Sequence, residues 1–327
     1  MIFELISIYF LENLTTFGGK MSQVPFLDSA SQGKNSWWRY LLTIILSLVL
    51  GTLASVILII VVLAVYSVYA GTKGFYLIDI NSTLSNPLFF LLEVGVGYSI
   101  SLLFFYLCLR VLHKRSLISI ISMDGKLSWG KMLKGAGLWT ALLFVTTILP
   151  IIVFGESDYS VTFDPKTFSI FLILCLITFP IQASFEEIFF RGYLMQGFGL
   201  LSKKPVIPLL STSVIFALMH FFNGTDLKTS LMFVSSAFVV GLMFGIIALG
   251  ENRIETAMGA HIANNLFVAL VYNSSDSGLG NLPSVVTVQP SDLYMGVVVT
   301  AVLAVIMITI IFWNKKNDLF NVFRLST

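Results

Sequence analysis

Charged side chains are scarce in this chain of 327 residues: they make up 11% of it, whereas hydrophobic residues make up 57%. A soluble domain carries about 25% charged residues, so the composition argues against an ordinary soluble protein. The apolar residues also come in long runs, of the roughly 20 residues that a helix needs to cross a bilayer. The composition therefore predicts an all-α, polytopic membrane helical bundle organised as one membrane domain.

Cysteines are also few, and no basic stripe is present. The 2 cysteines, Cys108 and Cys175, lie in apolar runs without the spacing of a ligand motif, so they are predicted to be packing thiols rather than a disulfide or a metal pair. The 19 basic residues nearly balance the 17 acidic ones, and they do not alternate with aromatics. Nucleic-acid binding therefore has no support.

Apolar runs of spanning length predict about eight transmembrane helices. They lie near residues 41–67, 88–110, 135–154, 167–199, 205–222, 231–249, 254–272 and 294–313. Residues 1–36 begin apolar and then turn polar, without the basic start or the clear cleavage site of a signal peptide. They are predicted to be an N-terminal interfacial helix or a disordered leader, and residues 37–327 the membrane domain.

The distribution of basic residues predicts the orientation. Lysine and arginine are retained on the cytoplasmic side of a membrane protein. With both termini in the cytoplasm, only Lys73, Lys166 and Lys228 of the 19 basic residues fall on the opposite side. We therefore expect a multi-pass protein of the cell membrane with both termini cytoplasmic.

Two glutamates and an arginine interrupt the run at 167–199. Ionisable groups inside a membrane are costly, and they mark functional sites. Glu187 and Arg191 are four residues apart and are expected to pair on one helix face. Glu186 points about 100° away, at 3.6 residues per turn, and is therefore expected to serve another partner. One glutamate is then structural and the other reactive.

Two of the 3 histidines, His220 and His261, also fall in predicted spans. Phe216 lies one turn before His220 and is expected to orient its ring. His261 and Asn265 are four residues apart, so they are expected to face one cavity, where both can donate hydrogen bonds to an oxyanion.

The expected depths of Glu186 and His220 in the membrane agree with each other, but that of His261 differs from them. Helical rise places Glu186 and His220 about 22–24 Å above Lys203 and Lys204, provided that the fourth helix continues to about Leu201. His261 lies only about 12 Å beyond Arg253, a mismatch that the sequence does not explain.

The motifs Glu-Glu-x-x-x-Arg, Phe-x-x-x-His and His-x-x-x-Asn, in this order on successive predicted helices, resemble those of the CAAX prenyl protease type II family. This group is also called the CPBP family, and it joins CAAX proteases with bacteriocin-processing and bacteriocin-immunity proteins. The resemblance covers about residues 165–272.

The resemblance implies an intramembrane glutamate protease that hydrolyses a membrane-associated or lipidated peptide. In that scheme Glu186 and His220 activate a water, and His261 with Asn265 stabilises the oxyanion. Glu187 and Arg191 hold the site in shape. Peptide hydrolysis needs a base, an acid for the leaving amine and oxyanion donors, which is consistent with these roles.

Other interpretations remain open. The protein could be a bacteriocin self-immunity membrane protein or a non-catalytic membrane scaffold. Two histidines and a glutamate could also bind zinc, but the helical signature His-Glu-x-x-His is absent, so no cofactor is predicted. The pair Gly241 and Gly245 predicts internal packing rather than dimerisation, and the sequence leaves the oligomeric state unknown.

Two further titratable residues are given structural interpretations. Glu93, inside the run at 88–110, is predicted to snorkel or to make a packing bond. His113, beside Lys114 and Arg115, is predicted to be a solvated loop residue.

Overall fold

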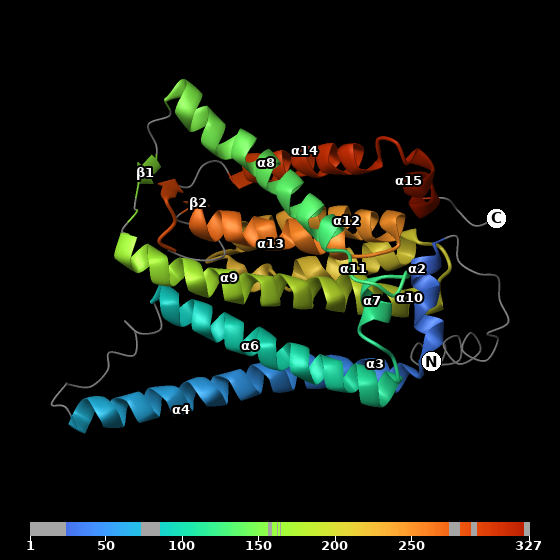
Figure 1. Ribbon diagram of the computed structural model, residues 1–327, viewed down its shortest axis with the longest axis horizontal. Coiled ribbons are helices and arrows are strands. Elements are labelled where there is room, and N and C mark those ends of the chain that lie inside the picture. The colour runs from blue at the N-terminus through green and yellow to red at the C-terminus, as the bar shows by residue number, and fades with distance from the viewer. Residues whose placement is uncertain are drawn as a thin grey trace.

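The computed structural model describes residues 24–72, 86–155, 159–161, 163, 165–274, 282–288 and 293–323. In this part of the chain, long helices lie side by side as one bundle, with α8 slanting across it (Figure 1). Among the described residues, seven helical stretches are long and apolar enough to cross a membrane. The predicted all-α polytopic bundle is thereby confirmed, and the chain is a multi-pass integral membrane protein.

The long helices follow the predicted runs. Three of them contain a π-helical segment. Helix α3 Trp37–Ile44 continues through Ile45–Leu50 into α4 Gly51–Thr72, α6 Pro87–Cys108 ends in the π-helical turn Leu109–His113, and α9 Pro165–Glu187 continues through Ile188–Leu194 into α10 Met195–Leu201. The others are α8 Trp129–Phe154, α11 Val206–Leu218, α12 Leu227–Glu251, α13 Glu255–Leu270 and α14 Leu293–Phe312. The fourth predicted helix thus reaches Leu201, as its depth requires.

Short elements connect them. They are α2 Pro25–Asp28, a 3₁₀ turn Ser29–Gln32, α7 Ile118–Ile121, a 3₁₀ turn Phe221–Asn223, α15 Lys316–Phe323, and the strands β1 Tyr159–Val161, β2 Tyr272–Ser274 and β3 Val286–Val288. The strands form a small sheet in the order β1-β3-β2, with β1 antiparallel and β2 parallel to β3. This sheet, which the sequence did not predict, lies at the end of the bundle opposite α2 and α15 (Figure 1).

One of the predicted runs, at 254–272, is not among the seven stretches of the described residues that are long and apolar enough to cross a membrane. Helix α13 has 16 residues, about 24 Å at 1.5 Å per residue, which is below the usual length of a span. It nevertheless carries the chain from the end of α12 back to β2 at the opposite end of the bundle (Figure 1). Arg253 is buried before it begins and donates to Ser122 Oγ at 2.7 Å. Because a loop covers this end of α13, a depth counted from Arg253 does not begin at the membrane surface. The mismatch predicted for His261 therefore has a physical explanation.

The predicted N-terminal leader is only partly described. Residues 1–23 lie outside the described residues, but the following segment folds into α2 and buries Phe26, Leu27 and Ala30 completely. The backbone N–H of Phe26 donates to Asn252 Oδ1 at 3.1 Å. The apolar side chains of this part of the segment complete the end of the bundle.

The interpretation of His113 as a solvated loop residue is also wrong. Its side chain is completely buried. Nδ1 lies 2.8 Å from the carbonyl oxygen of Lys34, and Nε2 lies 2.7 Å from the Tyr193 hydroxyl. The π-helical turn that extends α6 carries His113 under the N-terminal segment, which explains its burial. Cys108 and Cys175 are buried and free, as predicted.

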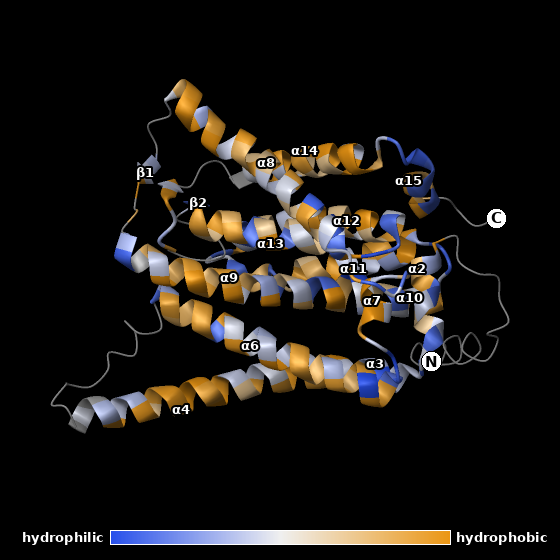
Figure 2. Cartoon of the chain, viewed as in Figure 1, coloured by the Kyte–Doolittle hydropathy of each residue, from blue (hydrophilic) through white to orange (hydrophobic). Residues whose placement is uncertain are grey.

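Apolar side chains cover much of the outside of the long helices, and polar residues gather near the ends of the bundle (Figure 2). Helices α2 and α15 lie at the same end (Figure 1), as a chain with both termini on one side requires. Which side is cytoplasmic stays a prediction from the basic residues.

An aromatic column fixes α9 against α6. The ring centroids of Phe105 and Phe185 lie 6.2 Å apart, those of Phe185 and Phe189 5.6 Å, and those of Phe105 and Tyr193 5.2 Å. Aromatic pairs at such distances stabilise their packing beyond the area that they bury. The column holds the end of α9, where the two glutamates lie, at a defined rotation toward α6.

Gly241 and Gly245 face the inside of the bundle. A Cβ atom on Gly241 would lie 3.3 Å from Ser213 Cα, and one on Gly245 would lie 2.4 Å from Leu209 Cδ1. The two glycines let α12 approach α11 closely, so the predicted internal packing of this pair is confirmed.

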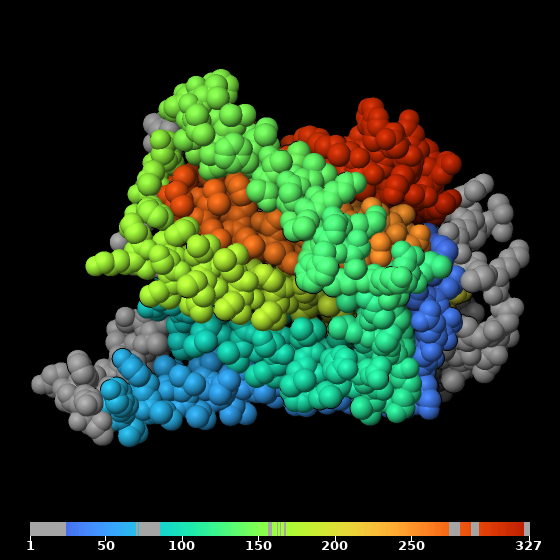
Figure 3. All heavy atoms as spheres, viewed as in Figure 1, coloured from blue at the N-terminus to red at the C-terminus, as the bar shows by residue number. Residues whose placement is uncertain are grey.

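Two other glycines bring α8 and α13 into direct backbone contact. A Cβ atom on Gly135 would lie 2.0 Å from the carbonyl oxygen of Thr256, and one on Gly259 would lie 1.9 Å from that of Met132. The reader can follow α8 as it crosses over α13 in Figure 3. The position of α13, and with it that of His261, therefore depends on these small residues.

We expect Gly259→Ala to destabilise the protein by about 1–3 kcal/mol, since overpacking a tight contact costs this much. The added methyl group meets backbone, so α8 has to move away from α13. Gly137→Ala in α8 is the matched control: no atom lies within 4 Å of the added Cβ, and alanine favours a helix by about 0.5–1 kcal/mol. Thermal unfolding in detergent compares them; equal midpoints would contradict the proposed close contact.

Candidate active site

The site forms where α9 becomes π-helical. Glu187 ends α9, and the π-helical segment Ile188–Leu194 follows and contains Arg191. Such π-helical insertions occur frequently at functional sites. Arg191 Nη1 donates to Glu187 Oε1 at 2.9 Å, and both side chains are completely buried. The predicted pair of Glu187 and Arg191 is confirmed.

Aromatic rings surround the Arg191 guanidinium. Its central carbon lies 4.1 Å from the ring centroid of Phe216, 5.4 Å from that of Phe244 and 5.9 Å from that of Phe190. A cation over aromatic faces is stabilised by the ring quadrupoles, and more strongly away from water. A Cβ atom on Gly241 would lie 3.4 Å from Arg191 Nη2, so the glycine leaves room for the guanidinium.

His261 joins the two glutamates. Its Nδ1 lies 2.8 Å from Glu187 Oε1, and its Nε2 lies 3.7 Å from Glu186 Oε2. Because the carboxylate paired with Arg191 can only accept, Nδ1 carries the hydrogen. The imidazole also stacks on Phe244, with ring centroids 5.3 Å apart. The carboxylate and the phenyl ring together fix the tautomer and the orientation of His261.

Glu186 has different partners, as predicted. Its Oε1 accepts hydrogen bonds from the Tyr98 hydroxyl at 2.6 Å and from Gln182 Nε2 at 3.3 Å. Its Oε2 is buried and has no hydrogen-bond partner among the described residues. One oxygen of this carboxylate is therefore held by two hydrogen bonds, whereas the other lies 3.7 Å from His261 Nε2.

Asn265 lies in a chain of amides. Its Nδ2 donates to Gln182 Oε1 at 3.4 Å, and its Oδ1 accepts from Asn264 Nδ2 at 3.1 Å. Trp139 Nε1 in turn donates to Asn264 Oδ1 at 3.1 Å. Gln182 thus connects Asn265 to Glu186, and the bond to Asn265 is long enough to be exchanged easily.

His220 stands just beyond the end of α11. Its Nδ1 donates to the carbonyl oxygen of Phe216 at 2.8 Å, and its ring lies 4.6 Å from the Phe216 ring. Since a carbonyl only accepts, Nδ1 carries the hydrogen, and Nε2 of the neutral ring is free to accept a proton. The prediction that Phe216 orients this histidine is confirmed.

Glu186 and His220 line one cavity of about 430 Å³ between α4, α6, α9 and α11. Its walls are Leu48, Thr52, Ser55, Phe90, Glu93, Val94, Gly97, Tyr98, Ser101, Gln182, Phe185, Glu186, Phe190, Phe216, Met219, His220 and Asn223. His261 and Asn265, which were expected to face the cavity, are not among them. They lie behind Glu186 and Gln182, because both are buried in the contacts described above.

The structure therefore brings five of the six predicted residues into one bonded cluster. Glu186, Glu187, Arg191, His261 and Asn265 are linked directly or through Gln182. The sixth, His220, faces the same cavity; among the described residues, no hydrogen bond joins it to the cluster.

Sequence reasoning missed Tyr98 and Gln182. Gln182 lies four residues before Glu186, so helical spacing could have identified it. Tyr98 belongs to a different helix without a motif, and no local signal pointed to it. No group of three or more His, Cys, Asp or Glu side chains in the described residues is arranged to hold a metal ion.

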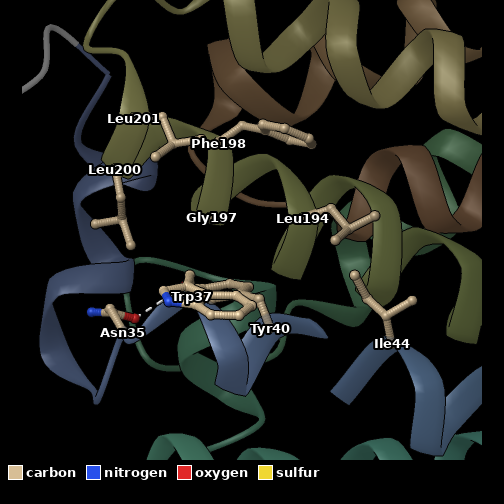
Figure 4. A pocket seen from close by; sticks show the side chains of 9 residues that line it. All are labelled: Asn35, Trp37, Tyr40, Ile44, Leu194, Gly197, Phe198, Leu200 and Leu201. Carbon is tan, nitrogen blue, oxygen red and sulfur yellow. Dashed lines mark hydrogen bonds between the residues drawn. The ribbon is translucent and has the colours of Figure 1, made fainter. Parts of the chain in front are cut away.

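A second, smaller pocket of about 150 Å³ lies between α3 and α10 (Figure 4). Leucines, Trp37 and Phe198 form much of its wall, and the Tyr40 hydroxyl donates to Asn35 Oδ1 at 3.0 Å beside it. None of the six predicted site residues lines this pocket, so it is not part of the candidate active site.

Comparison with known proteins finds a family model that matches the same part of the chain. Residues 168–267, which contain all six predicted residues, match the family model described as type II CAAX prenyl endopeptidase Rce1-like. The uncharacterized protein YyaK of Bacillus subtilis (strain 168) is 26% identical over 288 residues, which cover 88% of this chain and 95% of the relative. No solved structure matches the chain. Residues 168–267 are therefore similar to the Rce1-like type II CAAX prenyl endopeptidases, which supports a membrane peptidase of this kind.

Proposed function

We propose that this protein is an intramembrane endopeptidase that hydrolyses a membrane-associated peptide with a water activated by Glu186 and His220. The observation that carries the proposal is that Glu186 and His220 line one cavity, and that Glu186 Oε2 has no hydrogen-bond partner among the described residues. A water between them meets a carboxylate oxygen and an imidazole nitrogen, both able to accept its proton.

The charges of the cluster define its resting state. Glu186 and Glu187 supply two negative charges and Arg191 one positive charge, so one further proton makes the buried cluster neutral. A buried cluster with an uncompensated charge is costly. We place this proton on His261, which then has a hydrogen on Nε2 as well as on Nδ1.

The reaction follows from these groups. Glu186 takes a proton from the water, and the resulting hydroxide adds to the peptide carbonyl carbon. The carbonyl oxygen becomes an oxyanion, which the Asn265 amide and the Nε2–H of His261 stabilise by donation. For this, the oxygen replaces Gln182 Oε1 at Asn265. The tetrahedral intermediate then collapses, the C–N bond breaks, and the leaving amine takes the proton that Glu186 received from the water.

Membranes from cells that produce the wild type should contain cleaved peptides that are missing when Glu186→Gln replaces it at equal protein level. Mass spectrometry of the membrane peptides identifies the products. Identical peptides from both variants would contradict catalysis and favour the scaffold interpretation. An immunity role without cleavage would instead appear as bacteriocin protection that survives Glu186→Gln.

The absence of a cofactor remains a prediction, and the same preparation tests it. We expect cleavage to persist after exhaustive treatment with a chelator, since the proposed steps use only side chains and water. Loss of cleavage on chelation, restored by added zinc, would overturn this part of the mechanism.

A further inference from the structure

Glu93 is an acid that the mechanism does not use. It lies on α6, lines the cavity that contains Glu186, and is not covered by other parts of the protein. No hydrogen bond or ion pair joins it to another residue that the structure describes. The predicted packing bond is therefore not found, and a carboxylate inside a spanning helix usually faces a water-filled cavity and serves function.

The cavity is acidic. Glu93 and Glu186 are its charged wall residues, and none of the lysines or arginines that the structure describes lines it. A cleft lined by charge of one sign raises the local concentration of the opposite sign. Glu186 lines the same space and accepts hydrogen bonds there from Tyr98 and Gln182, which also line it. The cavity therefore favours a cationic group and disfavours a second carboxylate.

Helical geometry gives the distance between the two acids along the cavity. The Tyr98 hydroxyl donates to Glu186, so Tyr98 marks the position of Glu186 along α6. Glu93 lies five residues before Tyr98 on α6, or about 7.5 Å along the axis. An extended peptide advances about 3.3–3.6 Å per residue. A substrate that places its scissile bond at Glu186 thus places a residue about two positions away beside Glu93.

We propose that Glu93 is a specificity-determining residue that selects peptides with a lysine or arginine about two residues from the cleaved bond. Ser55, Thr52 and Ser101 form polar wall on α4 and α6 in the same cavity, where they can accept hydrogen bonds from an ammonium or guanidinium group. This inference rests on the proposed peptidase function and adds the substrate class to it.

A degenerate library of synthetic apolar peptides tests the proposal. The full-length protein, in nanodiscs of phosphatidylcholine, is incubated with peptides that carry Lys, Gln or Glu at each position, and mass spectrometry reads the cleaved bonds. We expect the wild type to cleave bonds with a Lys two residues away about tenfold faster than those with Gln, since a charged hydrogen bond contributes about 1.5–3 kcal/mol. Glu at that position should be cleaved slowest.

Two substitutions and a control separate the causes. Glu93→Gln should bring the Lys-to-Gln ratio close to one, and Glu93→Lys should reverse the order so that Glu is preferred. Asp124→Asn removes an exposed acid outside the cavity, whose side chain is 73% exposed, and should keep the wild-type ratio.

The outcomes also separate this inference from the proposed function. Cleavage that depends on Glu186 but has no Lys preference, or a preference that Glu93→Gln leaves intact, would overturn the role of Glu93 and leave the peptidase standing. A wild type that cleaves none of the peptides, like Glu186→Gln, would overturn both.

Discussion

Purified Glu186→Gln and His220→Gln variants should each hydrolyse peptide about 10²–10⁴-fold more slowly than the wild type, the range that general acid–base catalysis contributes. Glutamine keeps the hydrogen bond from Tyr98 to its carbonyl oxygen but cannot take the proton of water. In the His220 variant the amide cannot accept a proton as Nε2 does. The measurement is kcat with a fluorogenic peptide.

The double variant gives the sharper result. If both side chains act on one water, removing the second should cost little once the first is gone, because groups that act as a unit are not additive. If the loss of kcat in the double variant equals the product of the losses in the two single variants, Glu186 and His220 act in separate steps. Unchanged unfolding midpoints of all three variants serve as the control for folding.

The second large effect concerns stability. Arg191→Met should destabilise the protein by about 3–5 kcal/mol, because it leaves the completely buried Glu187 without its main counter-charge. Glu187→Gln combined with Arg191→Met removes both charges and should recover much of the loss. Thermal unfolding in detergent measures the three proteins.

An exposed ion pair provides the comparison. Lys203 and Asp28 lie 2.8 Å apart, with the lysine side chain 38% exposed, so Lys203→Met should cost no more than about 1 kcal/mol. An equal effect of Lys203→Met and Arg191→Met would contradict the special cost of the buried pair. A double variant no better than Arg191→Met would show that the guanidinium matters through its aromatic contacts instead.

Much of this site follows from local spacing. The pair of Glu187 and Arg191, the separate partner of Glu186 and the orientation of His220 by Phe216 all depend on neighbours one helical turn apart, which periodicity reports directly. The continuation of the fourth helix to Leu201 followed from matching two depths along straight helices. Predictions of this kind need only the rise and rotation of one element.

Other features depend on which elements meet. Tyr98 reaches Glu186 because an aromatic column sets the rotation of α6 against α9, and nothing near Tyr98 in the chain indicates this. His113 is buried only because the segment from Val24 folds over it. The Asn265 amide donates to Gln182 instead of lining the cavity, because Gln182 forms the cavity wall in front of it. Tertiary contacts of this kind have no local pattern for the sequence to reveal.

The π-helical segment Ile188–Leu194 has a consequence for comparing this chain with its relatives. A π turn closes its hydrogen bond one residue later than an α turn, so the faces presented before and after the segment are out of phase by one position. A relative with an uninterrupted α-helix here would match either α9 or α10 without a gap, but not both. A one-residue gap inside 188–194 is therefore the natural place to restore the correspondence, and a gap placed elsewhere would pair lipid-facing residues with buried ones.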